Sequence, residues 1–310
     1  MKARRLLIIS VVLILLCPGL MGESHKIGEN TIDISECRFG FAYDGMLLCN
    51  PVYIGPKEND YFEFAAENGI TFDYSKSYFA PFPESTLAHF IADKYGDTAV
   101  ILRSGRQYRA VIVKAGLYSD ACYTNWQYTL TPIDTIMNLA EWKETFLVTP
   151  SAKKYSGDLV GFKEYRPDDV SFLKIVDSVK QHMEDTWIIY NEEKDGEFMP
   201  VDADRISIKC YGRDTDSMPD NMFMSVGCYT GNSTSTWSAL YRLKYENDSW
   251  NTESIVNPEM GPGGYRFDSA FDLNGDGVME YLLIDYGGAS IYEIDDNGFI
   301  LITSSDYRGC

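Results

Sequence analysis

Four short strand-like segments near the C-terminus limit the possible folds of this chain more than any other feature. The segments are "YRFDSAF" (265–271), "EYLLIDY" (280–286), "ASIYEI" (289–294) and "FILITSS" (299–305). Their β-branched and aromatic residues favour strands. Only Gly287-Gly288 and "DDNG" separate the last three segments, and connections this short are typical of tight antiparallel hairpins. The spacing therefore predicts a four-stranded meander in sequential order.

The same pattern recurs about 60 residues earlier in the chain. There, "DTDSMPDNMFMSVGCY" aligns with the later stretch so that Asp220 falls under Glu280. The segment "RISIKCY" precedes it and "TWSALYRLKYE" follows it, in the order found in the later meander. Fixed-offset similarity of this kind indicates two copies of one structural unit. We expect the copies to span about 204–258 and 264–310.

The rest of the chain mixes strand-like and helix-like segments. Runs such as "AVILRSG", "YRAVIVKAG" and "DTWIIYN" favour strands, whereas 85–95, 133–144 and 167–185 favour helices. The third helix has an apolar face at the usual spacing, formed by Val170, Leu173, Val176, Val179 and Met183. The expected fold is mainly β with a few helices (α+β). It has a mixed region at 23–190 and an almost purely β region at 191–310.

The N-terminus has the anatomy of a signal peptide. Three cationic residues precede an apolar run, and Pro18 and small residues follow it before Glu23. We expect cleavage after residue 22, a secreted or periplasmic protein, and no stable membrane insertion of the mature chain, because the apolar run is too short to span a bilayer. Lipid anchoring through Cys17 is the less favoured alternative, since Leu16 precedes it where a small residue is usual.

Cysteine content and charge narrow the possible partners. Removal of Cys17 leaves six cysteines, and an even number in an exported chain predicts at least one disulfide, whose partners the spacing does not identify. The alternative is that several are buried free thiols. The net charge of −19 disfavours nucleic acid and anionic lipid and favours cations.

The stretch "DLNGDGVMEYLL" (272–283) has the composition of a calcium loop. Calcium takes six to eight oxygen ligands. Asp272, Asn274 and Asp276 offer side-chain oxygens at alternate positions, Val278 would give its backbone carbonyl, and Glu280 would close the shell. The sequence therefore predicts a structural Ca²⁺ site. The alternative interpretation is a polar turn without an ion, because each turn residue also suits a simple turn.

This loop differs from an EF-hand and is similar to another calcium-binding family. An EF-hand closes with Glu at loop position 12, which here is Leu283. A closing acid at position 9, directly before a strand, resembles the loop of FG-GAP and VCBS repeats, as in integrin alpha propellers. The resemblance covers 204–310 at most, and it implies propeller-blade meanders of about 60 residues. The earlier copy has Gly212 and Ser217 where the later has Asp272 and Gly277, so we expect Asp214, Asp216 and Asp220 to bind calcium weakly or not at all.

Catalytic signals in the sequence are sparse. The chain has three histidines and no H-E-x-x-H, G-x-S-x-G or phosphate-loop motif. A second acidic stretch, 191–202, has poor end residues for an EF-hand, and "EKDGEF" within it predicts a hairpin. The favoured function is a binding or surface-interaction module for a protein or carbohydrate ligand, without enzymatic activity. The alternative is a secreted hydrolase, with carbohydrate as one candidate substrate. Hydrolysis of carbohydrate would need a cleft with two close carboxylates.

Overall fold

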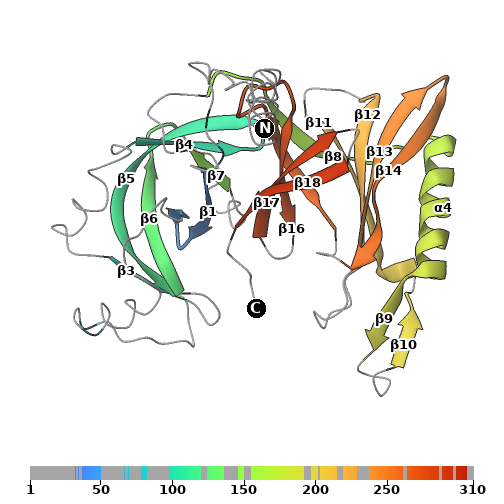
Figure 1. Ribbon diagram of the computed structural model, residues 1–310, viewed down its shortest axis with the longest axis horizontal. Helices are drawn as coiled ribbons and strands as arrows, with labels where there is room; N and C mark the ends of the chain where they lie inside the picture. Colours follow the sequence, from blue (N-terminus) through green and yellow to red (C-terminus); the bar gives the residue numbers. More distant parts are fainter. Residues whose placement is uncertain are drawn as a thin grey trace, which may run out of the picture.

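The computed structural model describes most of the chain after residue 36. The described residues are 32, 34, 37–49, 66, 69, 78–81, 98–119, 124–135, 146–149, 155–191, 197–201, 203–214, 219–228, 237–260, 264–285, 288–295 and 298–305. The expected signal peptide, the expected helix at 85–95 and residues 136–144 of the second expected helix lie outside them. The fold is mainly β, as predicted, and consists of an antiparallel barrel and a half-barrel (Figure 1).

The N-terminal half forms the barrel. Its strands are β1 (Arg38–Tyr43), β2 (Met46–Cys49), β3 (Tyr78–Pro81), β4 (Thr98–Arg103), β5 (Arg106–Ser119), β6 (Thr124–Pro132) and β7 (Phe146–Thr149). They form a sheet in the order β3-β5-β4-β7-β1-β2-β6, and β5 also pairs with β6. This extra pairing closes the sheet, because the long β5 bends from β4 to β6 along its length.

Successive side chains of β4 point alternately to the inside and the outside of the barrel, and both sets are buried. Ala99 and Ile101 point into the barrel core, whereas Val100 and Leu102 lie in a second core outside it. All four side chains are at most 2% exposed. A strand that is buried on both faces has a continuous run of apolar residues, and "AVIL" is such a run.

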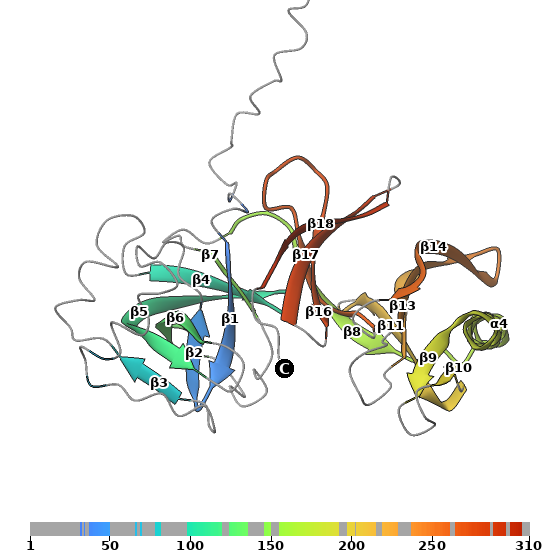
Figure 2. The same ribbon diagram turned by 60° about the horizontal axis from the view of Figure 1, so that its bottom comes forward.

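The second half forms a nine-stranded sheet that curls into the half-barrel (Figure 2). Its order is β14-β13-β12-β11-β8-β15-β16-β17-β18. The strands are β8 (Leu159–Tyr165), β11 (Ile206–Arg213), β12 (Asn221–Cys228), β13 (Trp237–Glu246), β14 (Ser249–Met260), β15 (Arg266–Phe271), β16 (Glu280–Asp285), β17 (Gly288–Asp295) and β18 (Gly298–Ser304). A hairpin of β9 (Ile188–Asn191) and β10 (Glu197–Pro200) and the short η4 (Ala203–Arg205) complete this half.

Two antiparallel meanders make up this sheet, and the later one has the strands and order that the sequence predicts. The earlier meander, β11 to β14, has the same order. The central strand β8 pairs with both β11 and β15, so the meanders belong to one continuous sheet. The change of sheet falls between β7 and β8. Strand β8 and helix α4 (Val170–Thr186), which the sequence analysis placed in the N-terminal region, therefore lie with the second sheet.

The outer face of the curled sheet is covered at two places. Helix α4 lies beside β13 and β14 (Figure 1), and the barrel packs against β15 to β17. The helix is where the sequence predicts it, but the predicted apolar face is partly wrong. Val179 and Met183 are buried, whereas Val170 is 67% and Leu173 is 47% exposed.

Contacts at the start of α4 explain why the buried face of the helix is rotated from the predicted one. Asp169 caps the helix by accepting hydrogen bonds from the backbone N–H groups of Ser171 and Phe172. The Ser171 hydroxyl accepts a hydrogen bond from the N–H of Trp250 on β14, at 3.1 Å, and the Phe172 ring packs edge-on against the Trp250 ring. Because Ser171 and Phe172 face the sheet, Val170 and Leu173 are turned toward solvent.

The inner face of the half-barrel is lined with aromatic side chains. They include Phe162, Tyr211, Phe223, Tyr265, Phe267, Tyr281, Tyr292 and Phe299. The Phe223 and Phe267 rings stack at 4.4 Å between centroids, and the Tyr292 and Phe299 rings stack at 4.0 Å. The aromatic side chains of the curled sheet thus pack against one another on its inner face, with no helix over them in the part of the chain that the structure describes.

A polar contact joins the barrel to the half-barrel. The register of β15 with β16 shifts between Phe267 and Ser269, and this bulge contains the buried Asp268. Its carboxylate accepts hydrogen bonds from the backbone N–H (2.7 Å) and hydroxyl (3.0 Å) of Ser104 at the β4–β5 turn. Gly105 follows with φ of 68° and lies against the Gly161 backbone, where a Cβ would come within 2.2 Å. The close approach therefore requires glycine at 105.

Four cysteines are described, and all are buried free thiols: Cys37, Cys49, Cys210 and Cys228. Burial raises the pKa of Cys49 and Cys210 to about 12 and that of Cys228 to about 11, so these thiols are inert at neutral pH. Cys122 and Cys310 lie outside the described residues, and the expected disulfide, for which the sequence assigns no partners, stays a prediction. Among the described residues no helix is long and apolar enough to cross a membrane.

Candidate functional site

The predicted calcium loop joins β15 to β16 and is held together by its own side chains. The Asp272 carboxylate accepts hydrogen bonds from the N–H groups of Gly275 (2.7 Å) and Gly277 (3.0 Å). The Asn274 side-chain oxygen accepts from the N–H of Asp276 at 2.9 Å. Positive φ angles at Gly275 (76°) and Gly277 (86°) let the chain turn back toward β16, which suits glycine at both positions.

Asp276 closes the exposed side of the loop. Its carboxylate accepts hydrogen bonds from the N–H of Val278 (2.7 Å) and from the Asn274 amide (3.0 Å). Each oxygen of these side chains has two acceptor sites, so accepting one N–H still leaves the oxygen able to bind a cation. The turn and a cation site are therefore compatible in the same residues.

Glu280 lies beneath the loop, at the first position of β16, and its side chain is 0% exposed. The oxygen Oε2 accepts a hydrogen bond from the N–H of Leu273 at 2.8 Å, whereas the buried Oε1 has no hydrogen-bond partner among the described residues. Burial raises the pKa of Glu280 to about 7. This value includes the opposing effect of the backbone hydrogen bonds and the smaller raising effect of the negative charges of Asp272 and Asp276. A buried carboxylate with a free oxygen is costly unless a proton or a cation compensates its charge.

A fifth side chain, Tyr155, anchors the loop from outside. Its hydroxyl accepts a hydrogen bond from the N–H of Asp272 (2.9 Å) and lies 2.8 Å from the Asp272 carbonyl oxygen, to which it donates. Burial raises the pKa of Tyr155 to about 12, so the hydroxyl keeps its proton. The sequence analysis did not identify this residue, which lies 117 positions earlier in the chain.

The donor set fits a calcium ion with mixed ligands. Among the described residues, no group of three or more His, Cys, Asp or Glu side chains is close enough to hold a metal alone. A site here would therefore need the Asn274 amide and the Val278 carbonyl beside the acidic side chains. Such mixed oxygen ligands suit calcium. The unpartnered Oε1 of Glu280 is the atom at which a cation or a proton would compensate the buried carboxylate.

The earlier meander lacks this arrangement at its equivalent loop. Asp220, which aligns with Glu280, is exposed, whereas Glu280 is fully buried. Asp214 is also exposed, and its N–H donates to the Gly161 carbonyl. Asp216 lies outside the described residues. Among the residues of the two loops that the structure describes, a buried carboxylate beside acidic side chains occurs in the later loop alone.

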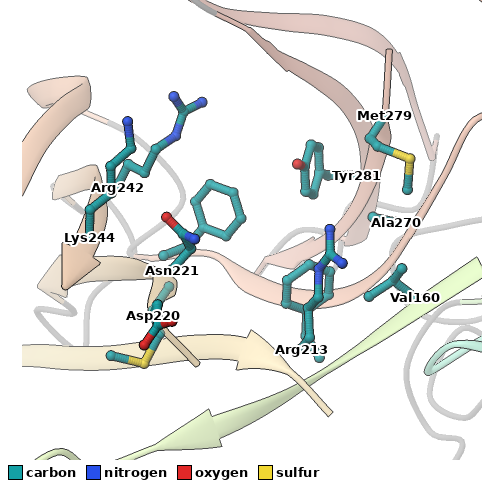
Figure 3. Close-up of a pocket in the computed structure, with 12 residues that line it drawn as sticks. Val160, Arg213, Asp220, Asn221, Arg242, Lys244, Ala270, Met279 and Tyr281 are labelled. Carbon is teal, nitrogen blue, oxygen red and sulfur yellow. The ribbon is translucent and has the colours of Figure 1, made fainter. Parts of the chain in front are cut away.

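A pocket of about 530 Å³ opens on the inner face of the half-barrel (Figure 3). It is lined by Val160, Phe162, Arg213, Asp220, Asn221, Met222, Phe223, Arg242, Lys244, Ala270, Met279 and Tyr281. Burial raises the pKa of Tyr281, and the charges of Arg242 and Arg213 oppose this increase, so both guanidinium groups act on the same hydroxyl.

The sequence analysis did not identify this pocket, because its residues come from strands far apart in the chain. The available signal was a cation at alternate positions near strand ends, as at Arg242 and Lys244. Comparisons of the chain with protein-family models, with curated proteins and with solved structures found no match.

Proposed function

We propose that this protein is an exported binding module whose half-barrel is stabilised by one structural calcium ion. Asp272, Asn274, Asp276, the Val278 carbonyl and Glu280 would hold the ion. The observation that carries the proposal is the Glu280 carboxylate, which is fully buried with one oxygen unpartnered beneath a loop of acidic side chains. The ion would neutralise this charge and the repulsion from Asp272 and Asp276.

The role of such an ion is structural. The loop joins two neighbouring strands, and Tyr155 fixes its first residue from the segment that precedes β8. Glu280 begins β16, so a ligand bond to its carboxylate would hold the end of that strand against the loop. The resemblance of 272–283 to the FG-GAP and VCBS loop supports calcium. It also supports the proposal that the two meanders are diverged copies of one blade-like unit, here joined edge to edge.

A binding role fits the pocket better than hydrolysis does. Glycoside hydrolysis needs two carboxylates that flank the scissile bond. The pocket lining contains one carboxylate, Asp220, and three cations, Arg213, Arg242 and Lys244. The proposed export depends on the signal-like segment 1–22, and a protein or carbohydrate partner outside the cell remains part of the proposal.

Calcium titration calorimetry of the unmutated protein and two variants tests the metal site. The unmutated protein should bind one calcium ion, and Asp276→Ala should lose at least about 1.5 to 3 kcal/mol of binding free energy through the missing charged ligand. Asp216→Ala, which removes the aligned acid of the earlier meander, should bind calcium as the unmutated protein does. Equal affinities of the two variants, or no binding heat and no competition with a calcium chelator dye, would contradict the proposal.

A further inference from the structure

The strand register places the pocket residues on one face of the sheet. Residues directly opposite each other in an antiparallel pair point to the same face. Phe223 pairs with Arg242, and Asn221 pairs with Lys244. Across the central strand, Arg213 pairs with Phe162. The cations therefore project from the aromatic inner face, and not from the outer faces that α4 and the barrel cover.

The later meander supplies the opposite wall of the same pocket. Ala270 pairs with both Val160 on β8 and Tyr281 on β16, which continues the row of inward-facing side chains. In Figure 3, Arg242 and Lys244 lie on one side of the pocket, and the Arg213 guanidinium points toward Tyr281 on the other. The pocket thus lies between the two meanders, with positive charge on both sides.

The charge of the pocket is opposite to that of the whole protein. The chain has 46 acidic and 27 basic residues, yet the pocket lining has three basic residues and one acidic residue. Arg242 is 20% exposed, and its ion pair with Glu253 is long, at 3.6 Å, with the Glu253 side chain 59% exposed. An ion pair with so exposed a partner contributes little free energy. Glu253 therefore does not compete strongly with a bound anion for Arg242.

The aromatic wall offers a flat surface to a planar group. The Phe223 ring stacks on Phe267 with 8° between the planes, and Tyr281 meets Phe223 edge-on at 5.4 Å. A volume of about 530 Å³ lies within the usual range for small-molecule sites. Guanidinium groups bind carboxylate and related oxyanions through paired hydrogen bonds.

We propose that this pocket binds a small organic anion, which lies in the positive field of Arg242 and Lys244 on one side and Arg213 on the other, and whose flat body packs against Phe223 and Tyr281. The inference rests on the binding role proposed above, but it does not depend on calcium. Glu280 and Tyr281 are neighbours on β16 and point to opposite faces, so the metal loop and the pocket are separate sites on one strand.

Two fluorescent probes that differ in one charged group test this proposal. The anion 8-anilinonaphthalene-1-sulfonate and the neutral N-phenyl-1-naphthylamine share the same aromatic body. The anion should bind the unmutated protein, and Arg213→Gln and Arg242→Gln should each weaken its affinity about tenfold, as loss of a charge-assisted hydrogen bond predicts. Both variants should bind the neutral probe as before.

Arg166→Gln is the matched control. The Arg166 side chain is 89% exposed and does not line this pocket, so the variant has the same charge change without altering the site. Its affinity for both probes should equal that of the unmutated protein. If Arg213→Gln and Arg242→Gln bind the anion as well as Arg166→Gln does, or lose the neutral probe equally, the pocket does not bind anions.

The unmutated protein alone provides a second test, in case a variant does not fold. Raising the salt from about 20 to about 500 mM should weaken binding of the anionic probe several-fold and leave the neutral probe unchanged. Benzoate should displace the anionic probe, and neutral benzamide should not. Equal displacement by both, or salt-independent binding, would overturn the inference. These results are independent of the calcium titration, so either proposal can fail alone.

Discussion

The two meanders of the half-barrel share strand order and spacing but differ at one buried position. Strands β11 and β15 begin 60 residues apart, at Ile206 and Arg266. At the start of the next strand, Glu280 is fully buried, whereas the aligned Asp220 is exposed to solvent. Two meanders with the same strand order can therefore differ in the side-chain charge that they bury. The buried carboxylate gives the later meander a charge that must be compensated, and the earlier meander has no such requirement.

The coverage of the two meanders differs as well. The outer face of the earlier one packs against α4, and that of the later one packs against the barrel. Both contribute their inner faces to one aromatic core, with Leu240 of β13 and Leu283 of β16 in the same cluster. This shared core predicts that the two meanders unfold together.

Core truncations in each meander should test this cooperativity and have the largest effect. Leu243→Ala in the earlier meander and Leu283→Ala in the later one remove side chains that are 0% and 1% exposed. Each should lower the free energy of unfolding by about 2 to 5 kcal/mol. Calorimetry should show a single transition for the half-barrel in both variants. Two transitions, with only one moved by each substitution, would show that the meanders are independent units.

The pH dependence of stability should separate Glu280 from Asp220. In chelator, the folded-state pKa of Glu280 is about 7, above its ordinary 4.5, so the folded protein holds this proton more tightly than the unfolded chain does. The resulting stability is fully present below pH 4.5 and is lost as the pH rises through 7. We expect a loss of up to about 3 kcal/mol from this group.

Glu280→Gln should remove this part of the pH dependence, because the amide does not titrate. Asp220→Asn changes an exposed side chain and should retain it. Urea unfolding at pH 4.5, 6 and 7.5 in chelator measures the difference. If the free energy of unfolding of Glu280→Gln varies with pH in parallel with that of the unmutated protein, Glu280 does not titrate in this range.

Removal of the Tyr155 hydroxyl should have a smaller effect that is specific to the later meander. Tyr155→Phe loses the hydrogen bonds to the Asp272 backbone, which should cost about 1 kcal/mol and weaken calcium binding. Tyr165→Phe removes a hydroxyl that donates to the Arg213 carbonyl beside the earlier loop, and it is the matched control. The control should leave calcium affinity unchanged. Equal calcium affinities for the two variants would exclude an anchoring role for Tyr155.

Local sequence signals predicted the parts of the fold that depend on neighbouring residues. The later meander has short turns, so the order of its strands follows from spacing alone, and the Asp, Asn and Gly residues of the loop indicate a turn that can bind a cation. Helix α4 was located by its cap, but its buried face depended on Trp250, 79 positions from Ser171. Periodicity alone does not show which of two adjacent apolar residues faces the sheet.

Contacts between residues far apart in the chain could not be predicted from local sequence patterns. The barrel closes only because β5 pairs with both β4 and β6, and β8 becomes the central strand only because it pairs with β11 and β15. The cations of the pocket lie at ordinary alternate positions of their strands. They converge because the sheet curls, and single-strand patterns do not contain that information.

Thermal unfolding of the unmutated protein in calcium, magnesium and chelator tests the central claim most directly. The proposed calcium ion would bind only the folded loop, so a hundredfold excess over its Kd should stabilise the protein by about 2.7 kcal/mol. Magnesium should have little effect, because it keeps its waters and demands a stricter geometry. A melting temperature that rises with calcium and stays low in magnesium and chelator is the predicted result. Equal melting temperatures in all three would mean that 272–280 is a turn without a metal.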